Sequence, residues 1–290
     1  MEAFLHQVFS GLATGGIYAS LALALVMIYQ STNHINFAQG EMAMFSTYLA
    51  WSMINGGIPY WWAFLLTVLI SFVAGVVIER IIIRPVEHAP VLAIITVFVA
   101  LLVIFNSVAG WIFTYTIKVF PSPFPEQPLF GNRFISSHEM GAIGITLVVL
   151  VLLYVFFRFT PLGLAMRAAA QNATSSRLVG IRVGWMLALG WGLAAAVGAV
   201  AGMLVAPIVY LEPNMMSGVL LYAFAVALVG GIDSPFGAVV GGFTVGVLEN
   251  ILGAYVIGTE LKLTVALVLI IGVLLVKPTG LFGKVFVTRV

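Results

Sequence analysis

The sequence contains no cysteine, and only 8% of its 290 residues are charged. Without cysteine there is no disulfide, no thiol nucleophile and no thiolate metal ligand. The 4 histidines are scattered along the chain, which argues against a metal site. A soluble domain has about a quarter of its residues charged, so this composition excludes an ordinary soluble fold. The net charge of +2 is too small to indicate nucleic acid as a partner.

Hydrophobic residues, in contrast, make up 62% of the chain. They form long continuous runs and do not alternate with polar residues, which favours membrane-spanning helices over a β-barrel. We therefore predict an all-α integral membrane protein, a polytopic bundle of about 8–9 transmembrane helices. The runs that predict these helices are 8–29, 37–54, 64–83, 91–117, 140–159, 184–210, 219–230, 237–256 and 261–276.

Two polar interruptions, at 30–41 and 230–236, fall between these runs. We interpret them as one or two broken or re-entrant segments, whose freed backbone groups are tolerated only inside protein or against water. The alternative is a tight turn with ordinary capping. Their weak symmetry along the chain indicates a translocation path. The residues that we predict to line it are Asn33, Asn36, Phe37, Gln39, Gly40, Gly230 and Gly231.

A third polar stretch runs from 160 to 181. Thr160 followed by Pro161 predicts the start of a helix, and Asn172 predicts the start of a second short one. Gly180 is expected to end that second helix. Apolar residues at helical spacing predict a face opposite Arg167, and they are Leu162, Ala165, Met166 and Ala169. Such a helix pair fits either a handle for a soluble partner or an interfacial helix lying on anionic lipid.

Lys and Arg gather in cytoplasmic loops of membrane proteins. Most of the 12 basic residues fall in three segments: Arg80 and Arg84, the stretch from Arg158 to Arg182, and the C-terminal stretch from Lys277. This places those segments and the C-terminus on the cytoplasmic side. The long loop 118–139 and the loop 210–218 are then predicted to be external, and the prolines between 121 and 128 exclude regular structure in the first half of the former.

Few ionisable residues lie at apparent membrane depth, and they are Glu41, Asp233 and Glu249, with His34 nearby. Such residues are costly in a bilayer and are often functional. Capping at helix starts explains Glu41 and Asp233, whereas Glu249 is expected to reach the membrane interface. Asn106, inside the run 91–117, is predicted to form a hydrogen bond between helices.

Four stretches in chain order carry a family resemblance: INFAQGE at 35–41, the segment 160–181, GGIDSPFGAVVGG at 230–242 and KPTGLFG at 277–283. The chain resembles the LivH-type permeases of bacterial ABC importers for branched-chain amino acids. The resemblance implies a single transmembrane permease domain, 1–290, in the bacterial inner membrane, with 160–184 as the cytoplasmic loop that couples it to the ATPases. The coupling residues implied are Thr160, Pro161, Gly163, Met166, Arg167, Ala168, Asn172, Arg177, Leu178 and Gly180.

The partners implied by this resemblance are a second homologous permease, two ABC ATPase subunits, membrane lipid and an external solute-binding protein that meets the loops 118–139 and 210–218. ATP and magnesium would bind the ATPases, and no cofactor is expected in this chain. The sequence agrees, since it contains no Gly-x-x-x-x-Gly-Lys-Ser/Thr phosphate loop.

Two other function classes compete with an amino-acid importer. The first is a passive channel or ion-coupled carrier for a small neutral solute such as urea or an amide, which would need Glu41, Asp233 or Glu249 in its path. The second is an intramembrane enzyme. The sequence disfavours an enzyme and predicts no catalytic residue, because no paired carboxylates, histidine cluster or nucleophile–base pair occurs at usable spacing.

Overall fold

The structure is a computed structural model that describes residues 2–32, 34–87, 89–125, 136–258 and 261–283. In these ranges helices are joined by short loops, and an isolated antiparallel bridge joins Lys118 to Leu211. Six of the described helices are long and apolar enough to cross a membrane: Ala3–Gln30, Tyr60–Val86, Val91–Phe113, Ser137–Phe159, Val183–Val209 and Pro235–Ile257. The predicted all-α polytopic class is therefore confirmed.

Three further helices are shorter than the roughly 20 residues that span a bilayer core, and the last two of them are apolar. They are α2 (Gln39–Asn55), α9 (Met215–Gly230) and α11 (Lys262–Val276), with 17, 16 and 15 residues. Two of them, α2 and α9, directly adjoin the predicted helix breaks. The number of complete membrane crossings stays a prediction.

The chain divides into two compact units, and we name each after one of its helices. The α8 unit comprises Met27–Pro123 and Leu147–Ser217. Helix α8 (Val183–Val209) packs along both α3 (Tyr60–Ile78) and α2, and α4 (Val91–Phe113) packs on α2. Small residues permit this packing, because a side chain at Gly202 would meet the backbone of Ala43 in α2.

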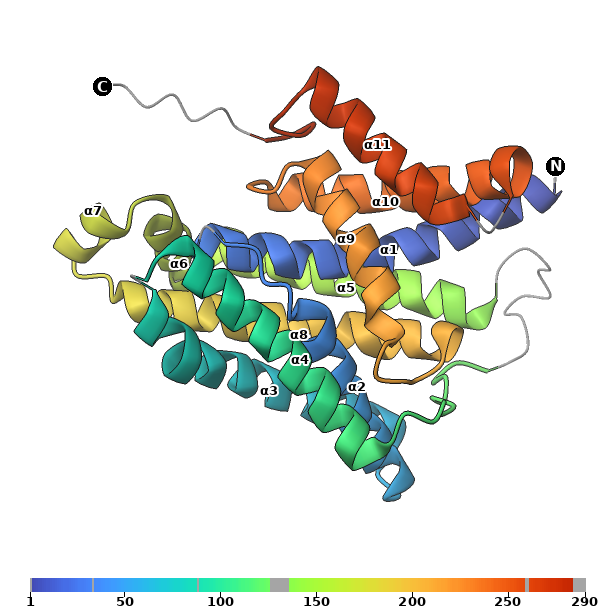
Figure 1. Cartoon of the computed structure of the whole chain (residues 1–290), viewed down its shortest axis with the longest axis horizontal. Coiled ribbons are helices and arrows are strands. Elements are labelled where there is room, and N and C mark those ends of the chain that lie inside the picture. Colours follow the sequence, from blue (N-terminus) through green and yellow to red (C-terminus); the bar gives the residue numbers. More distant parts are fainter. Residues whose placement is uncertain (1, 33, 88, 126–135, 259–260, 284–290) are drawn as a thin grey trace. The chain divides into compact units, whose positions relative to one another are not determined.

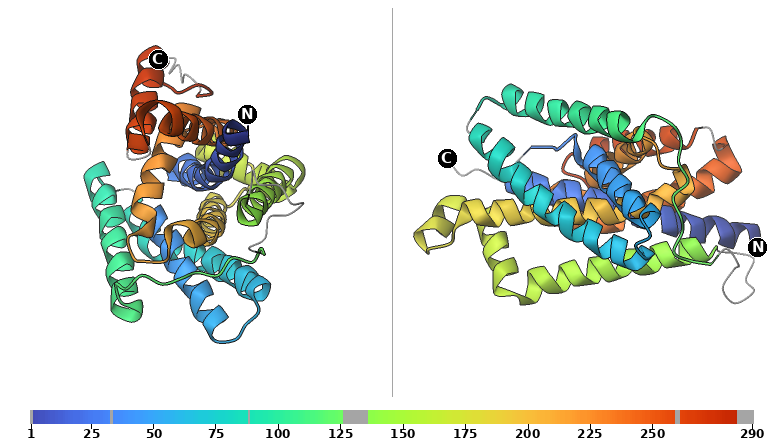
Figure 2. Two further views of the ribbon diagram at one scale, coloured as in Figure 1. Left: turned by 90° about the vertical axis from the view of Figure 1, so that its right-hand side faces the viewer. Right: turned by 90° about the horizontal axis from the view of Figure 1, so that it is seen from below.

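The α10 unit comprises Met1–Val26, Phe124–Thr146 and Gly218–Val290. Helix α10 (Pro235–Leu252) runs beside α11, as Figures 1 and 2 show. It also touches α1 (Glu2–Thr32), where a side chain at Gly242 would collide with the backbone of Ala19. The remaining long helix, α5 (Ser137–Phe159), has its first residues in this unit and its last in the α8 unit.

Two predicted boundaries were wrong. The helix predicted for the run 64–83 begins earlier, at Tyr60, and extends beyond Ile83, because α3 continues through a π-helical turn, Glu79–Ile83, and a 3-10 turn, Arg84–Val86. The apolar residues between Arg80 and Arg84 prolong the helix there. The run 91–117 is helical only to Phe113, since Thr114 adopts a left-handed φ of 64° and the Tyr115 ring folds back onto Gly110.

Different loops lie at the two ends of α8. At its N-terminal end, the Arg80 guanidinium lies 3.9 Å from the centre of the Trp185 ring, and Arg84 lies against Gly184. Beyond its C-terminal end, Lys118 and Leu211 exchange two backbone hydrogen bonds of 2.9 Å. The two arginine-bearing segments therefore share one end of the unit and the loops beginning at 118 and 210 share the other, as the charge pattern predicted. Residues 126–135 of the loop 118–139 lie outside the described residues.

Candidate functional site

The segment 160–181 folds into the predicted pair of short helices. Thr160 caps α6 (Pro161–Gln171), its hydroxyl accepting a hydrogen bond from the Gly163 amide at 3.0 Å. Asn172 caps α7 (Ala173–Leu178) in the same way, through a 2.9 Å bond from the Ser175 amide. Gly180 follows with a φ of 85°, which favours glycine and ends the second helix. These signals are local, and each is confirmed.

The α6–α7 segment buries one side and exposes its tip. Met166 and Ala169 are buried, and α6 packs on α8, as the predicted apolar face requires. Leu162, assigned to the same face, is instead 40% exposed. At the tip, Leu178 and Val179 are 84% and 77% exposed, and Arg177 is exposed beside them.

Three other predicted coupling residues lie closer to the helix bundle. Gly163 is buried at the corner where α6 leaves α5, and a side chain there would collide with the backbone of Phe156. Pro161 occupies the first helical position, and Ala168 is half-buried. The corner between α5 and α6 thus depends on residues that were assigned to coupling from the resemblance alone.

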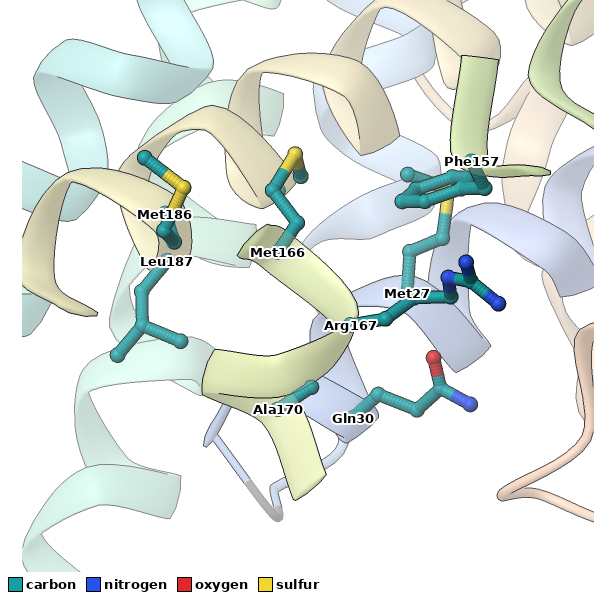
Figure 3. Close-up of a pocket in the computed structure, with 9 residues that line it drawn as sticks. Met27, Gln30, Phe157, Met166, Arg167, Ala170, Met186 and Leu187 are labelled. Atoms are coloured by element: carbon teal, nitrogen blue, oxygen red, sulfur yellow. The ribbon is translucent and has the colours of Figure 1, made fainter. Parts of the chain in front are cut away.

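Arg167 departs from its predicted position on the exposed face. It is half-buried and lines a pocket of about 40 Å³, together with Met27 and Gln30 of α1 and Phe157 of α5 (Figure 3). Residue 167 follows the buried Met166 by one position, about 100° around the helix, so it lies at the edge of the buried face. The four-residue apolar pattern missed this because it treated every non-apolar position as outward-facing.

The first predicted helix break lies between α1 and α2. Asn33 lies outside the described residues. Asn36 and Gln39 are fully buried: Asn36 accepts a bond from the Ala38 amide at 3.0 Å and donates to the Gln39 side-chain oxygen at 3.4 Å. Gln39 in turn donates to the Ala194 carbonyl of α8 at 3.0 Å. These amides therefore satisfy polar groups at the break. Phe37 is half-buried and Gly40 is buried.

Glu41 lies in the first turn of α2, as predicted, and is only 5% exposed. The side-chain nitrogen of Asn106 lies 3.4 Å from its carboxylate. The same nitrogen lies 3.0 Å from the Pro213 carbonyl and 3.0 Å from the Asn214 side-chain oxygen. The predicted interhelical bond of Asn106 is confirmed, and it also holds the loop 210–218, which sequence reasoning missed because no local signal marks so distant a partner.

The second break, between α9 and α10, is a tight turn in which Gly230 and Gly231 are buried. Gly231 has a φ of 107° and lies against the backbone of Gly283. The amides of Leu281 and Phe282 donate to the carbonyls of Val229 and Gly230, at 2.8 and 2.9 Å. The two glycine-bearing motifs, 230–242 and 277–283, therefore form one structure. Ser234 caps α10 as predicted, accepting a bond from the Gly237 amide at 3.0 Å.

Glu249 does not reach an interface, contrary to prediction. It is 4% exposed, and Tyr18 and Tyr222 lie close to its carboxylate, whose Oε2 has no hydrogen-bond partner among the described residues. The two tyrosine rings stack with centroids 4.7 Å apart, and the Lys262 ammonium donates to Asn250 at 2.6 Å. Helices α1 and α9 cover the carboxylate, and their proximity to α10 is invisible in the local sequence.

Comparison with known proteins bears on what these segments do. The model of the family described as branched-chain amino acid transport system / permease component matches residues 7–274. The chain belongs to this family. This permease is 32% identical to the high-affinity branched-chain amino acid transport system permease protein LivH of Salmonella typhimurium, over 99% of this chain and 98% of that one. It is 31% identical, over the same shares, to the corresponding protein BraD of Pseudomonas aeruginosa.

A solved structure of PsaBC from Streptococcus pneumoniae in complex with Fab covers 96% of the permease and 91% of that chain, with a TM-score of 0.47 and 13% identity. That likeness is too weak to carry an argument. Of the predicted path residues in the permease, Asn36, Phe37, Gln39 and Gly40 belong to the α8 unit, whereas Gly230 and Gly231 belong to the α10 unit. Their role in a path stays a prediction, as do the roles of the coupling residues.

Proposed function

We propose that this chain is the transmembrane permease subunit of an ATP-driven ABC importer for branched-chain amino acids. The observation that carries the proposal is the full-length correspondence: the family match spans 7–274, and LivH and BraD align over 98% of their own length. Those relatives are named as branched-chain amino acid permeases. No observation favours a channel or an ion-coupled carrier, since the relatives are named as permeases and Glu41 is engaged in a buried hydrogen bond with Asn106.

The importer would combine this permease with a second homologous permease and two ABC ATPase subunits, which hold ATP and magnesium. The tip of α6–α7 supports this proposal. Leu178 and Val179 are large apolar side chains that project from a short helical pair beside the charged Arg177. Exposed apolar groups next to a charge fit burial in a protein partner. We assign the ATPase contact to this tip.

The protein would lie in the bacterial inner membrane as a multi-pass protein, with α6–α7 and the C-terminus in the cytoplasm. The external solute-binding protein would meet the opposite end of α8, where the bridge between Lys118 and Leu211 joins two loops. Trp51 supports this end, because its ring nitrogen donates to the Val119 carbonyl at 3.2 Å and the Lys118 ammonium lies 4.9 Å from its ring centre. A surface held in this way is preorganised for docking.

The test is purification of the full chain from native membranes in mild detergent, followed by reconstitution into liposomes. We expect an ATPase pair and a second permease to co-purify, and we expect radiolabelled leucine to accumulate only with ATP and the binding protein. A non-hydrolysable ATP analogue is the control and should abolish uptake. Recovery of the chain alone, with leucine or urea flux that is independent of ATP, would replace the proposal with the channel reading.

A further inference from the structure

The pocket beneath α6 is built from four helices of the α8 unit. Met27 and Gln30 come from α1, Phe157 from α5, Arg167 from α6 and Met186 from α8. Figure 3 shows Arg167 and Gln30 extending to the same side of the ribbon, with Phe157 above them. Most side chains that line the pocket are therefore apolar. The exceptions are the cation of Arg167 and the carboxamide of Gln30.

The cation in this pocket has no counterion of its own. The Nε of Arg167 is buried and has no hydrogen-bond partner, and no carboxylate of the described residues lies within ion-pair distance of it. A buried N–H donor that is withdrawn from water needs an acceptor, because an unsatisfied buried polar group destabilises the folded chain. A ligand with an anionic oxygen acceptor would remove that cost.

The size and the walls of the pocket narrow the ligand further. A volume of about 40 Å³ holds roughly three waters, which accommodates a carboxylate group and leaves the hydrocarbon chain of the ligand to extend along the pocket wall. A single guanidinium binds a planar carboxylate through two parallel hydrogen bonds, whereas a dianionic phosphate needs more donors than this lining offers. Methionine side chains adapt to a small branched or linear aliphatic group.

We propose that this pocket is a binding site for a small aliphatic monocarboxylate, with its carboxylate on Arg167 and its hydrocarbon chain against Met27, Met166 and Met186. The bound ligand touches α6 on one side and α1, α5 and α8 on the other. It therefore holds the short helix onto the bundle. The mobility of α6 therefore decreases as the concentration of the carboxylate, and with it the occupancy of the pocket, increases.

The test uses the full-length chain in detergent, with the subunits that co-purify, and isobutyrate as the probe. Saturation-transfer NMR on the isobutyrate methyl groups should show saturable binding. Isobutyramide has the same shape without the charge and should bind about tenfold more weakly. Hydrogen exchange should show that isobutyrate protects the amides of α6 and leaves those of α10 unchanged.

Three variants test separately whether the Arg167 charge binds the carboxylate and whether the ligand lies in this pocket. Arg167→Gln should weaken isobutyrate binding about tenfold or more, since it removes a charge-assisted bond. Ala170→Met fills the pocket, whose wall includes Ala170, and should abolish binding while the cation is retained. Arg158→Gln is the matched control, because Arg158 is an exposed arginine in the last turn of α5, and binding should stay within about twofold.

Several outcomes would overturn the proposal. They are equal binding of isobutyramide, displacement by inorganic phosphate, persistence of binding in a folded Arg167→Gln variant, and absence of saturable binding to the unmodified chain. Loss of ATPase co-purification in Arg167→Gln, without isobutyrate binding to the unmodified chain, would instead make Arg167 a partner contact. Because the readout is binding to the chain itself, it is separate from leucine uptake, on which the proposed function depends.

Discussion

Replacement of Gln39 by methionine tests whether this residue is structural or lines a path. The substitution keeps the length and volume of the side chain and removes its amide. Gln39 loses its 3.0 Å bond to Ala194, and Asn36 loses the acceptor of a 3.4 Å bond. The side-chain nitrogen of Asn36 then retains only the Met42 sulfur, at 3.7 Å.

The expected cost follows from which groups are left unpaired. Ala194 lies inside α8, so its carbonyl keeps its helical hydrogen bond when the bond from Gln39 is removed. The free-energy cost at Ala194 is therefore small. The Asn36 amide is fully buried and becomes undersatisfied, which costs about 1–3 kcal/mol. With the lost bond from Gln39 itself, we expect destabilisation of roughly 2–4 kcal/mol. For a chain of 290 residues this corresponds to a fall of about 3–7 °C in the melting temperature.

The assay is thermal unfolding in detergent, read by the fraction that stays monodisperse, with leucine uptake normalised to folded protein. Gln171→Met, at an exposed position of α6, is the matched control and should change stability by less than about 0.5 kcal/mol. An unchanged melting temperature for Gln39→Met would refute the account of the buried amides. A stable variant with altered uptake would show that Gln39 acts on the solute.

Three further predictions concern local contacts. Gly231→Val should prevent residues 281–283 from docking, because Gly231 has a positive φ and abuts the Gly283 backbone; the amides of Leu281 and Phe282 should then exchange hydrogen faster, whereas Gly218→Val, at an open site, should leave their exchange unchanged. Thr160→Ala should destabilise α6 by about 1 kcal/mol and speed its hydrogen exchange, and unchanged exchange would contradict the capping role. Asn106→Leu removes the donor that joins α2 to the loop 210–218, so amide exchange in that loop should rise while exchange in α6 stays the same.

The helix starts were predictable because their causes are local. Thr160 with Pro161, Asn172, and Ser234 with Pro235 each place a side-chain acceptor directly before the free amides that it caps. The helix class followed equally directly from the long apolar runs. Neither inference requires knowledge of which helices are neighbours.

Long-range neighbours account for what the sequence did not reveal. Glu249 was expected at an interface because the residues next to it allow that, yet Tyr18 and Tyr222 from distant parts of the chain bury it. Arg167 was placed on the polar face because a pattern of apolar and polar positions assigns every residue to one of two helix faces. Residues at the edge of a buried face are decided by the shape of the neighbouring helices, which for Arg167 includes Phe157.

The docking of residues 281–282 onto the turn between α9 and α10 has a consequence for biosynthesis. The carbonyls of Val229 and Gly230 receive their bonds from amides that leave the ribosome long after the turn itself. Until then, the turn carries backbone acceptors that no later segment has covered. Maturation of this part of the membrane protein therefore waits for the later-translated motif 277–283, and a chain released before that motif would display the uncovered turn to cellular proteases.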